Sequence, residues 1–173
     1  MELLEIMKNR RSVRTYTGEP IPREKLEQVI QAGLLSPSGR SIRPWELIVV
    51  RDKETLQQMA GCREGAANML KDADTAIVVI ADPEKTDVWT EDCSIVMAQM
   101  HLMADSLGLG SCWIQGRLRT VGDTTTEDYL RKLLDYPEGY KLEAILSLGM
   151  PANHPAARTL EELPEEKVHW GTF

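Results

Sequence analysis

The segment 91–107 constrains the fold of this chain more than any other. Its residues have helical character, and apolar side chains occupy nearly every side of the predicted helix: Ile95, Val96, Met97, Ala98, Met100, Leu102, Met103 and Leu107. A helix that is apolar all round must be covered on most of its surface. In a chain of only 173 residues, a second subunit is one candidate for part of that cover.

Helices and strands alternate along the rest of the chain. Thr75–Ala81 is almost entirely apolar, which predicts a strand buried on both faces. The interleaved order predicts one sheet with helices on both sides and a single domain over residues 1–173. The expected helices are 2–9, 22–36, 54–60, 64–71, 91–107 and 125–134. Thr124 and Glu127 would form a capping box at the start of the last helix. The expected strands are 45–50, 75–81, 111–114 and 140–148.

Composition excludes several classes of partner. Apolar content is 42% and the net charge is −7, as in an ordinary globular enzyme and unlike a protein that tracks a phosphate backbone. No apolar run approaches the ~20 residues that a membrane helix needs, so no membrane partner is expected. The N-terminal segment lacks the apolar core of a signal peptide. These features predict a cytoplasmic protein that binds neither nucleic acid nor membrane.

Cysteine and histidine spacing gives no sign of a metal site. The cysteines at 62, 93 and 112 form no C-x-x-C pair and are expected to be reduced and mostly buried. The histidines at 101, 154 and 169 lack zinc-ligand spacing. We therefore expect no metal and no catalytic acid, base or nucleophile among the side chains.

A basic cluster stands out on this acidic chain at Arg10-Arg11-Ser12-Val13-Arg14. Guanidinium groups present rigid sets of donors that suit phosphate oxygens, and the Ser12 hydroxyl adds another donor. An anion site, most simply for a cofactor phosphate, is one interpretation. The other is that cations near the end of the helix over 2–9 complement its dipole. The cluster alone does not decide between them.

Three further segments complete an ordered set. They are the turn-rich loop SPSGRSIRPW at 36–45, the segment GLGSCWIQG at 108–116, and Arg158 within the polar, proline-containing tail 150–173. Taken alone, Pro37-Ser38-Gly39 is an ordinary loop and Trp113 an ordinary core residue. Arg40 and Arg43 are interpreted as solvated, with an entrance for an anionic substrate or pyridine nucleotide as the alternative.

Together and in this order, the four segments resemble the FMN-dependent nitroreductase family over nearly the whole chain. The resemblance implies a three-layer α/β/α fold of the α+β class, with a central mixed, mostly antiparallel sheet flanked by helices. It also implies an intertwined homodimer with one FMN at each end of the interface, and a tail, 150–173, that wraps the partner subunit.

The resemblance also assigns cofactor contacts. Arg10, Arg11 and Ser12 would hold the FMN phosphate with Arg158, and Arg14 would face the flavin N1 and the C2 oxygen. A fixed cation there stabilises the negative charge that reduction adds. The loop from the other subunit would supply Pro37, Ser38, Gly39 and Ser41, and the strand behind the flavin would supply Trp113, Ile114, Gln115 and Gly116.

The implied function is an FMN-dependent oxidoreductase that takes electrons from NADH or NADPH and reduces nitroaromatics, quinones or similar acceptors by a ping-pong mechanism. Two alternatives stay open: an FMN storage or sensor protein without efficient turnover, and a flavin-fragmenting or dehalogenating offshoot. Several residues depart from the family pattern. Ser41 replaces a frequent Asn, Arg43 a frequent Gln, Arg117 a frequent aromatic residue and Ala156 a frequent second tail cation.

Overall fold

A computed structural model describes residues 2–173. Its four-stranded sheet has the order β1-β2-β6-β3, and every neighbouring pair in it is antiparallel. A parallel bridge between Ser12 and Ser111 adds the N-terminal segment at the β3 edge. The elements in chain order are α1 (Leu3–Asn9), α2 (Arg23–Leu34), β1 (Trp45–Val50), α3 (Lys53–Met59), β2 (Thr75–Ala81), α4 (Trp89–Ser106), β3 (Gly110–Gln115), β4 (Thr120–Val121), β5 (Thr124–Thr125), α5 (Thr126–Leu134) and β6 (Lys141–Gly149).

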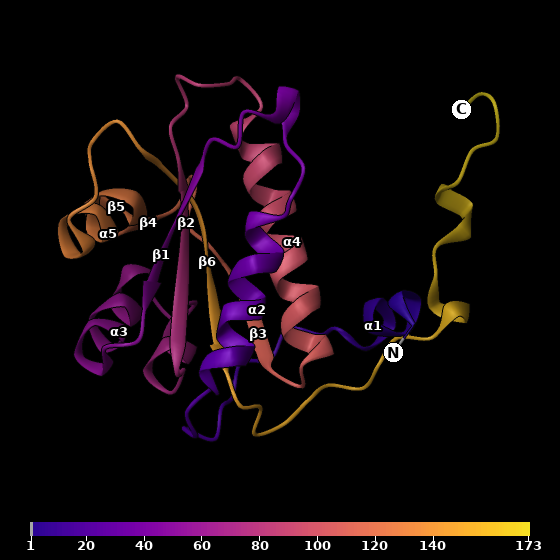
Figure 1. Ribbon diagram of the computed structural model, residues 1–173, viewed down its shortest axis with the longest axis horizontal. Helices are drawn as coiled ribbons and strands as arrows, with labels where there is room; N and C mark the ends of the chain where they lie inside the picture. The colour runs from indigo at the N-terminus through magenta and orange to yellow at the C-terminus, as the bar shows by residue number, and fades with distance from the viewer. Residues whose placement is uncertain (1) are drawn as a thin grey trace.

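Helices cover both faces of the sheet, so the predicted three-layer α+β architecture is confirmed (Figure 1). Side chains alternate across β2: Ile77 and Val79 face α2 and α4, whereas Ala76 and Val78 face the layer of α3 and α5. Every residue of β2 is buried, as expected for a strand between two helical layers.

The strands β1 and β2 have the predicted bounds. Two predicted helices need correction. The segment 64–71 contains only a 3-10 turn, Asn68–Lys71, because Gly65 takes a left-handed φ of 71° and interrupts any α-helix. The helix predicted over 125–134 begins one residue later, because its N-cap is Thr125, whose hydroxyl accepts from the N–H of Asp128, and not Thr124.

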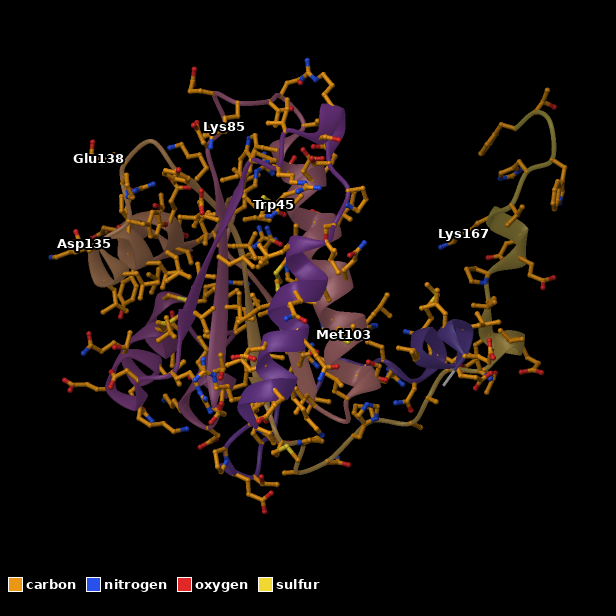
Figure 2. The ribbon with its side chains drawn as sticks, viewed as in Figure 1. Trp45, Lys85, Met103, Asp135, Glu138 and Lys167 are labelled. Carbon is orange, nitrogen blue, oxygen red and sulfur yellow. The ribbon has the colours of Figure 1, made fainter. Side chains whose placement is uncertain are left out.

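The central helix α4 is covered by the sheet and α2 on one side only. Val96, Met97 and Met100 are fully buried there, and Trp45 of β1 packs into the same core (Figure 2). The helix ends where Gly108 adopts a φ of 73°, as the sequence predicts for a C-cap glycine. On the side away from the sheet, Ile95 is 38% exposed. One chain alone therefore leaves part of this helix exposed, and the expectation that a second subunit covers that part stays a prediction.

Helix α1 and the C-terminal tail lie apart from the body of the molecule (Figure 1). Helix α1 and the C-terminal segment project from one side, with Lys167 far from the sheet (Figures 1 and 2). No residue of α1 is buried, and Trp170 in the tail is 91% exposed. Within residues 2–173, no helix is long and apolar enough to cross a membrane.

Candidate functional site

The basic cluster lies along the β3 edge of the sheet. The Val13 N–H donates to the carbonyl of Ser111 at 2.9 Å, which holds residues 12–14 beside the strand. Val13 is buried, and a Cβ at Gly110 would lie 2.7 Å from its Cγ1. Only a glycine at position 110 therefore allows the two backbones to approach so closely. Because alternate side chains of an extended segment point in opposite directions, burial of Val13 leaves Ser12 and Arg14 on the accessible side.

The hydroxyl of Tyr16 links this segment to β6 by hydrogen bonds. The Tyr16 hydroxyl donates to the carbonyl of Val13 at 3.0 Å and lies 2.7 Å from the Ser147 hydroxyl of β6. Burial raises the pKa of Tyr16 well above its usual range, so the phenol stays protonated as a donor. The basic cluster is thus attached to the core through Val13 and Tyr16.

The tail crosses the basic cluster. The Arg11 guanidinium donates to the carbonyl of Ala156, and the Arg158 N–H donates to the carbonyl of Lys8 at 2.9 Å. His154 and Asn9 both contact Asp105 at the end of α4, at 3.2 and 2.8 Å. These contacts bring the backbone of Arg158 close to residues 8–11. The Arg158 side chain lines a neighbouring hollow with Glu5, so its predicted contact with a cofactor phosphate stays a prediction.

Beside the basic cluster, His101 is buried and neutral. Its Nδ1 lies 2.6 Å from the Ser111 hydroxyl. Burial, with a smaller contribution from the positive charge of Arg10, lowers the pKa of His101 to about 4. His101 therefore adds no positive charge to this site near neutral pH.

A cavity of about 410 Å³ opens next to Arg14, and three of the residues predicted on β3 line it: Trp113, Ile114 and Gln115. The Trp113 indole N–H donates to the Gln115 side-chain oxygen at 2.9 Å, and the Gln115 amide donates to the carbonyl of Arg117 at 3.1 Å. These bonds fix the end of β3. A Cβ at Gly116 would lie 2.4 Å from Leu142 Cδ2, so this position requires glycine.

The cavity lining also includes two arginines that were not predicted from the sequence. Arg63 donates from Nη1 to the carbonyl of Gln115 at 3.1 Å, and Arg119 is part of the same lining. Arg63 belongs to no local motif, and its approach to β3 depends on how the chain folds. Arg119 follows β3 by four residues, and its nearness to the segment 108–116 is the signal in the sequence that could have indicated it.

The predicted loop 36–44 does not reach this cavity within one chain. It is held elsewhere, because the Gly39 N–H donates to Asp92 of α4 at 2.8 Å and the Ser38 hydroxyl accepts from the N–H of Arg43 at 2.9 Å. Arg40, Ser41 and Arg43 all have a positive φ, between 52° and 56°. Non-glycine residues rarely adopt this conformation, and clusters of them are typical of functional loops. Pro37 and Ser41 are exposed on the same loop.

Fold and site together define an α+β protein with a basic sheet edge and an adjoining cavity that has an aromatic residue in its lining. The family model of the Nitroreductase family matches residues 7–61 and 57–150. This chain belongs to the nitroreductase family, and the predicted membership is confirmed. It is accordingly an oxidoreductase.

Solved structures of family members superpose closely on this chain. An FMN-dependent nitroreductase from Clostridium difficile R20291 is 43% identical, with a TM-score of 0.96 over 98% of this chain and 99% of that one. The NADPH:FMN oxidoreductase of Vibrio harveyi, solved with NAD⁺, is 25% identical, with a TM-score of 0.83 over 99% of this chain and 77% of that one. The FMN reductase [NAD(P)H] of Bacillus subtilis is 27% identical over 97% of this chain and 72% of its own length.

Proposed function

We propose that this chain is an FMN-dependent oxidoreductase that takes electrons from NADH or NADPH and passes them to nitroaromatics, quinones or similar acceptors. One observation carries the proposal: Arg14, Trp113 and Gln115 line a single cavity, and Arg10, Arg11 and Ser12 directly precede Arg14 on the segment held beside β3. FMN and NAD(P)H also stand in the names of the relatives.

The charges around the cavity fit a cofactor with a phosphate and an electron-poor ring. Within the described part of the chain, no carboxylate lies within 4 Å of Arg10, Arg11, Arg14 or Arg158, whereas Arg23, Arg40, Arg51 and Arg131 all have one. Unpaired guanidinium groups repel one another and favour an anionic ligand that neutralises them. The cluster is therefore suited to phosphate oxygens, which accept paired donors from arginine.

The residues of this chain have distinct proposed roles toward FMN, which supplies a centre that accepts two electrons and passes them on. Arg10, Arg11 and Ser12 bind the phosphate. Arg14 stabilises negative charge on the pyrimidine edge of the ring, and because its charge is fixed in place, little reorganisation is needed. The strand Trp113–Gly116 supports the ring with its backbone. No side-chain acid or base is assigned to the hydride transfer.

We also propose that the functional unit is an intertwined homodimer. Leu3, Leu4 and Met7 of α1 are exposed apolar residues, and so are Leu160, Leu163, Val168 and Trp170 of the tail. Large exposed apolar side chains that gather on two projecting segments are typical of an interface. In the dimer, the tail 150–173 wraps the partner, and the loop with Pro37, Ser38, Gly39 and Ser41 reaches the partner's flavin. The cytoplasm, which holds the NAD(P)H pool, is the proposed location.

Spectroscopy of the purified protein tests this function. The holoprotein is expected to be yellow, to bleach when NADH or NADPH is added without oxygen, and to recolour with a nitroaromatic or quinone. A flavin store would bind FMN but would bleach slowly or not at all. A preparation that does not take up FMN would contradict the proposal, and a stopped-flow comparison of both nucleotides would identify the donor.

A further inference from the structure

The turn that follows β3 is rigid and strained. The N–H groups of Gly116 and Arg117 donate to the carbonyl of Glu143 at 3.3 and 2.9 Å, and the Arg119 N–H donates to the carbonyl of Gly116 at 3.2 Å. Leu118, at the tip of the turn, has a φ of 57° and is 79% exposed. A left-handed leucine is energetically unfavourable and persists only where its surroundings fix it. The turn therefore holds its two arginines in defined places.

These two arginines flank the end of β3. The Arg117 guanidinium lies over the ring of Trp89, 5.6 Å from its centroid. Both residues form part of the wall of a second cavity. That cavity, of about 600 Å³, is lined by Trp89, Gly116, Arg117 and Arg119 among others. Arg119 also lines the 410 Å³ cavity beside Arg14. It therefore stands on the boundary between the proposed flavin cavity and a neighbouring hollow with an aromatic wall.

Across the described residues, ion pairs do not neutralise Arg63 or Arg119, whereas Arg117 lies close enough to Glu91 and Glu143 to interact with their charges. Within residues 2–173, no carboxylate lies within 4 Å of Arg63, Arg117 or Arg119. The carboxylates on the far wall of the second cavity, Glu127 and Asp128, are already paired with Arg131 at 2.9 and 2.5 Å. The end of β3 is thus a local concentration of positive charge on a chain whose net charge is −7.

We propose that the electron acceptor of this enzyme is an aromatic compound with a carboxylate, and that Arg119, assisted by Arg63, binds that carboxylate beside the flavin. The inference rests on the proposed function and names the substrate class of the same site. A neutral acceptor would leave these cations unpaired, whereas an aromatic carboxylate gains charge-assisted contacts with the exposed Arg119 and the half-buried Arg63. Specificity arises because the site discriminates by charge between acceptors of equal shape.

A pair of isosteric probes separates charge from shape. Benzoate and benzamide, which the flavin does not reduce, are titrated into the oxidised holoenzyme, and binding is followed by the change in flavin absorbance. We expect benzoate to bind more tightly than benzamide, by up to about fivefold for one partly exposed ion pair and by about tenfold if both guanidinium groups take part. The ratio should fall as KCl is added, because salt screens such pairs.

The same ratio is then measured in variants and in turnover. Arg119→Gln should reduce the preference, and the double change Arg63→Gln with Arg119→Gln should abolish it. Arg23→Gln on α2, which removes a surface cation paired with Glu27, should leave it unchanged. The kcat/KM ratio of 4-nitrobenzoate to 4-nitrobenzamide should follow the binding ratio.

The possible outcomes distinguish failure of the carboxylate assignment from failure of the proposed FMN-dependent oxidoreductase function. Equal binding of benzoate and benzamide by the wild-type holoenzyme, or a preference that KCl does not weaken, would overturn the carboxylate assignment while leaving an FMN oxidoreductase intact. A wild-type preference that survives in the double variant would refute the role of Arg63 and Arg119. A chain that takes up no FMN would instead overturn the proposed function itself.

Discussion

Replacing Arg14 by alanine should lower the midpoint potential of the bound FMN. Arg14 lines the cavity with Trp113 and Gln115, and its Nη1 contacts only the carbonyl of Ser12, at 3.4 Å, so the charge is not consumed by an internal ion pair. Reduction adds negative charge to the pyrimidine edge, and a cation stabilises the reduced state more than the oxidised one. Removal of Arg14 should therefore make reduction less favourable.

The size of the decrease in midpoint potential follows from the free energy of one hydrogen bond to a charged group. A hydrogen bond to a charged group contributes roughly 1.5–3 kcal/mol. For a two-electron couple, 1.4 kcal/mol corresponds to about 30 mV, so the full range is about 30–65 mV. Arg14 is exposed in the single chain. Solvent screening places the expected decrease in the lower half of that range, at about 30–45 mV.

The assay is a redox titration of the purified holoprotein with a reference dye, repeated for wild type, Arg14→Ala, Arg14→Lys and Arg23→Ala. Lysine keeps the charge but loses the planar set of donors, so its potential should lie between those of wild type and alanine. Arg23→Ala removes an exposed cation of α2 and should match the wild type. An Arg14→Ala protein that binds FMN at an unchanged potential would refute the role assigned to Arg14.

Three further changes test the fold around the site. Gly116→Ala should destabilise the protein by about 1–3 kcal/mol in urea unfolding, since its Cβ would clash with Leu142, whereas Gly139→Ala, with open space around it, should not. His101, with a pKa of about 4 in the fold and 6.5 when unfolded, binds a proton more readily in the unfolded state, so stability should fall from pH 7 to pH 5 by about 2 kcal/mol more than in His101→Gln. Removal of residues 160–173 should weaken dimerisation in sedimentation experiments if the tail wraps the partner, and an unchanged dimer would contradict that role.

Local signals in the sequence were sufficient for the regular elements. The apolar stretch Thr75–Ala81 and the strand Trp45–Val50 have the predicted bounds, because hydrophobic runs of this length between turn residues have few other structural outcomes. Errors arose where the conformation or capping role of a single residue determines whether a helix forms or where it begins. A left-handed Gly65 converted a predicted helix into a 3-10 turn, and the shift of one N-cap from Thr124 to Thr125 moved the start of α5.

The candidate site was predictable only in part, for a different physical reason. Arg14 and the segment Trp113–Gln115 belong to motifs that the sequence displays, and the fold places them on one cavity. Arg63 lies on a segment without a motif, and it reaches that cavity only because the chain folds back to the end of β3. Long-range proximity of this kind has no local signature. Arg119 follows β3 by four residues, so its place beside the cavity is a local consequence of the turn after the strand.

The same contacts serve folding and the proposed chemistry. The segment that carries Arg14 is fixed by burial of Val13, by the glycine at 110 and by the Tyr16 hydroxyl, none of which would contact a cofactor. Such support lets the cations stay close together despite their mutual repulsion, because the backbone that carries them is part of the core. Electrostatic stabilisation of a reduced cofactor requires charges that are already in place before electrons arrive. In this chain the β3 edge supplies both the rigidity and the charge, whereas in the proposed dimer the exposed apolar residues of α1 and the tail would contact a second copy.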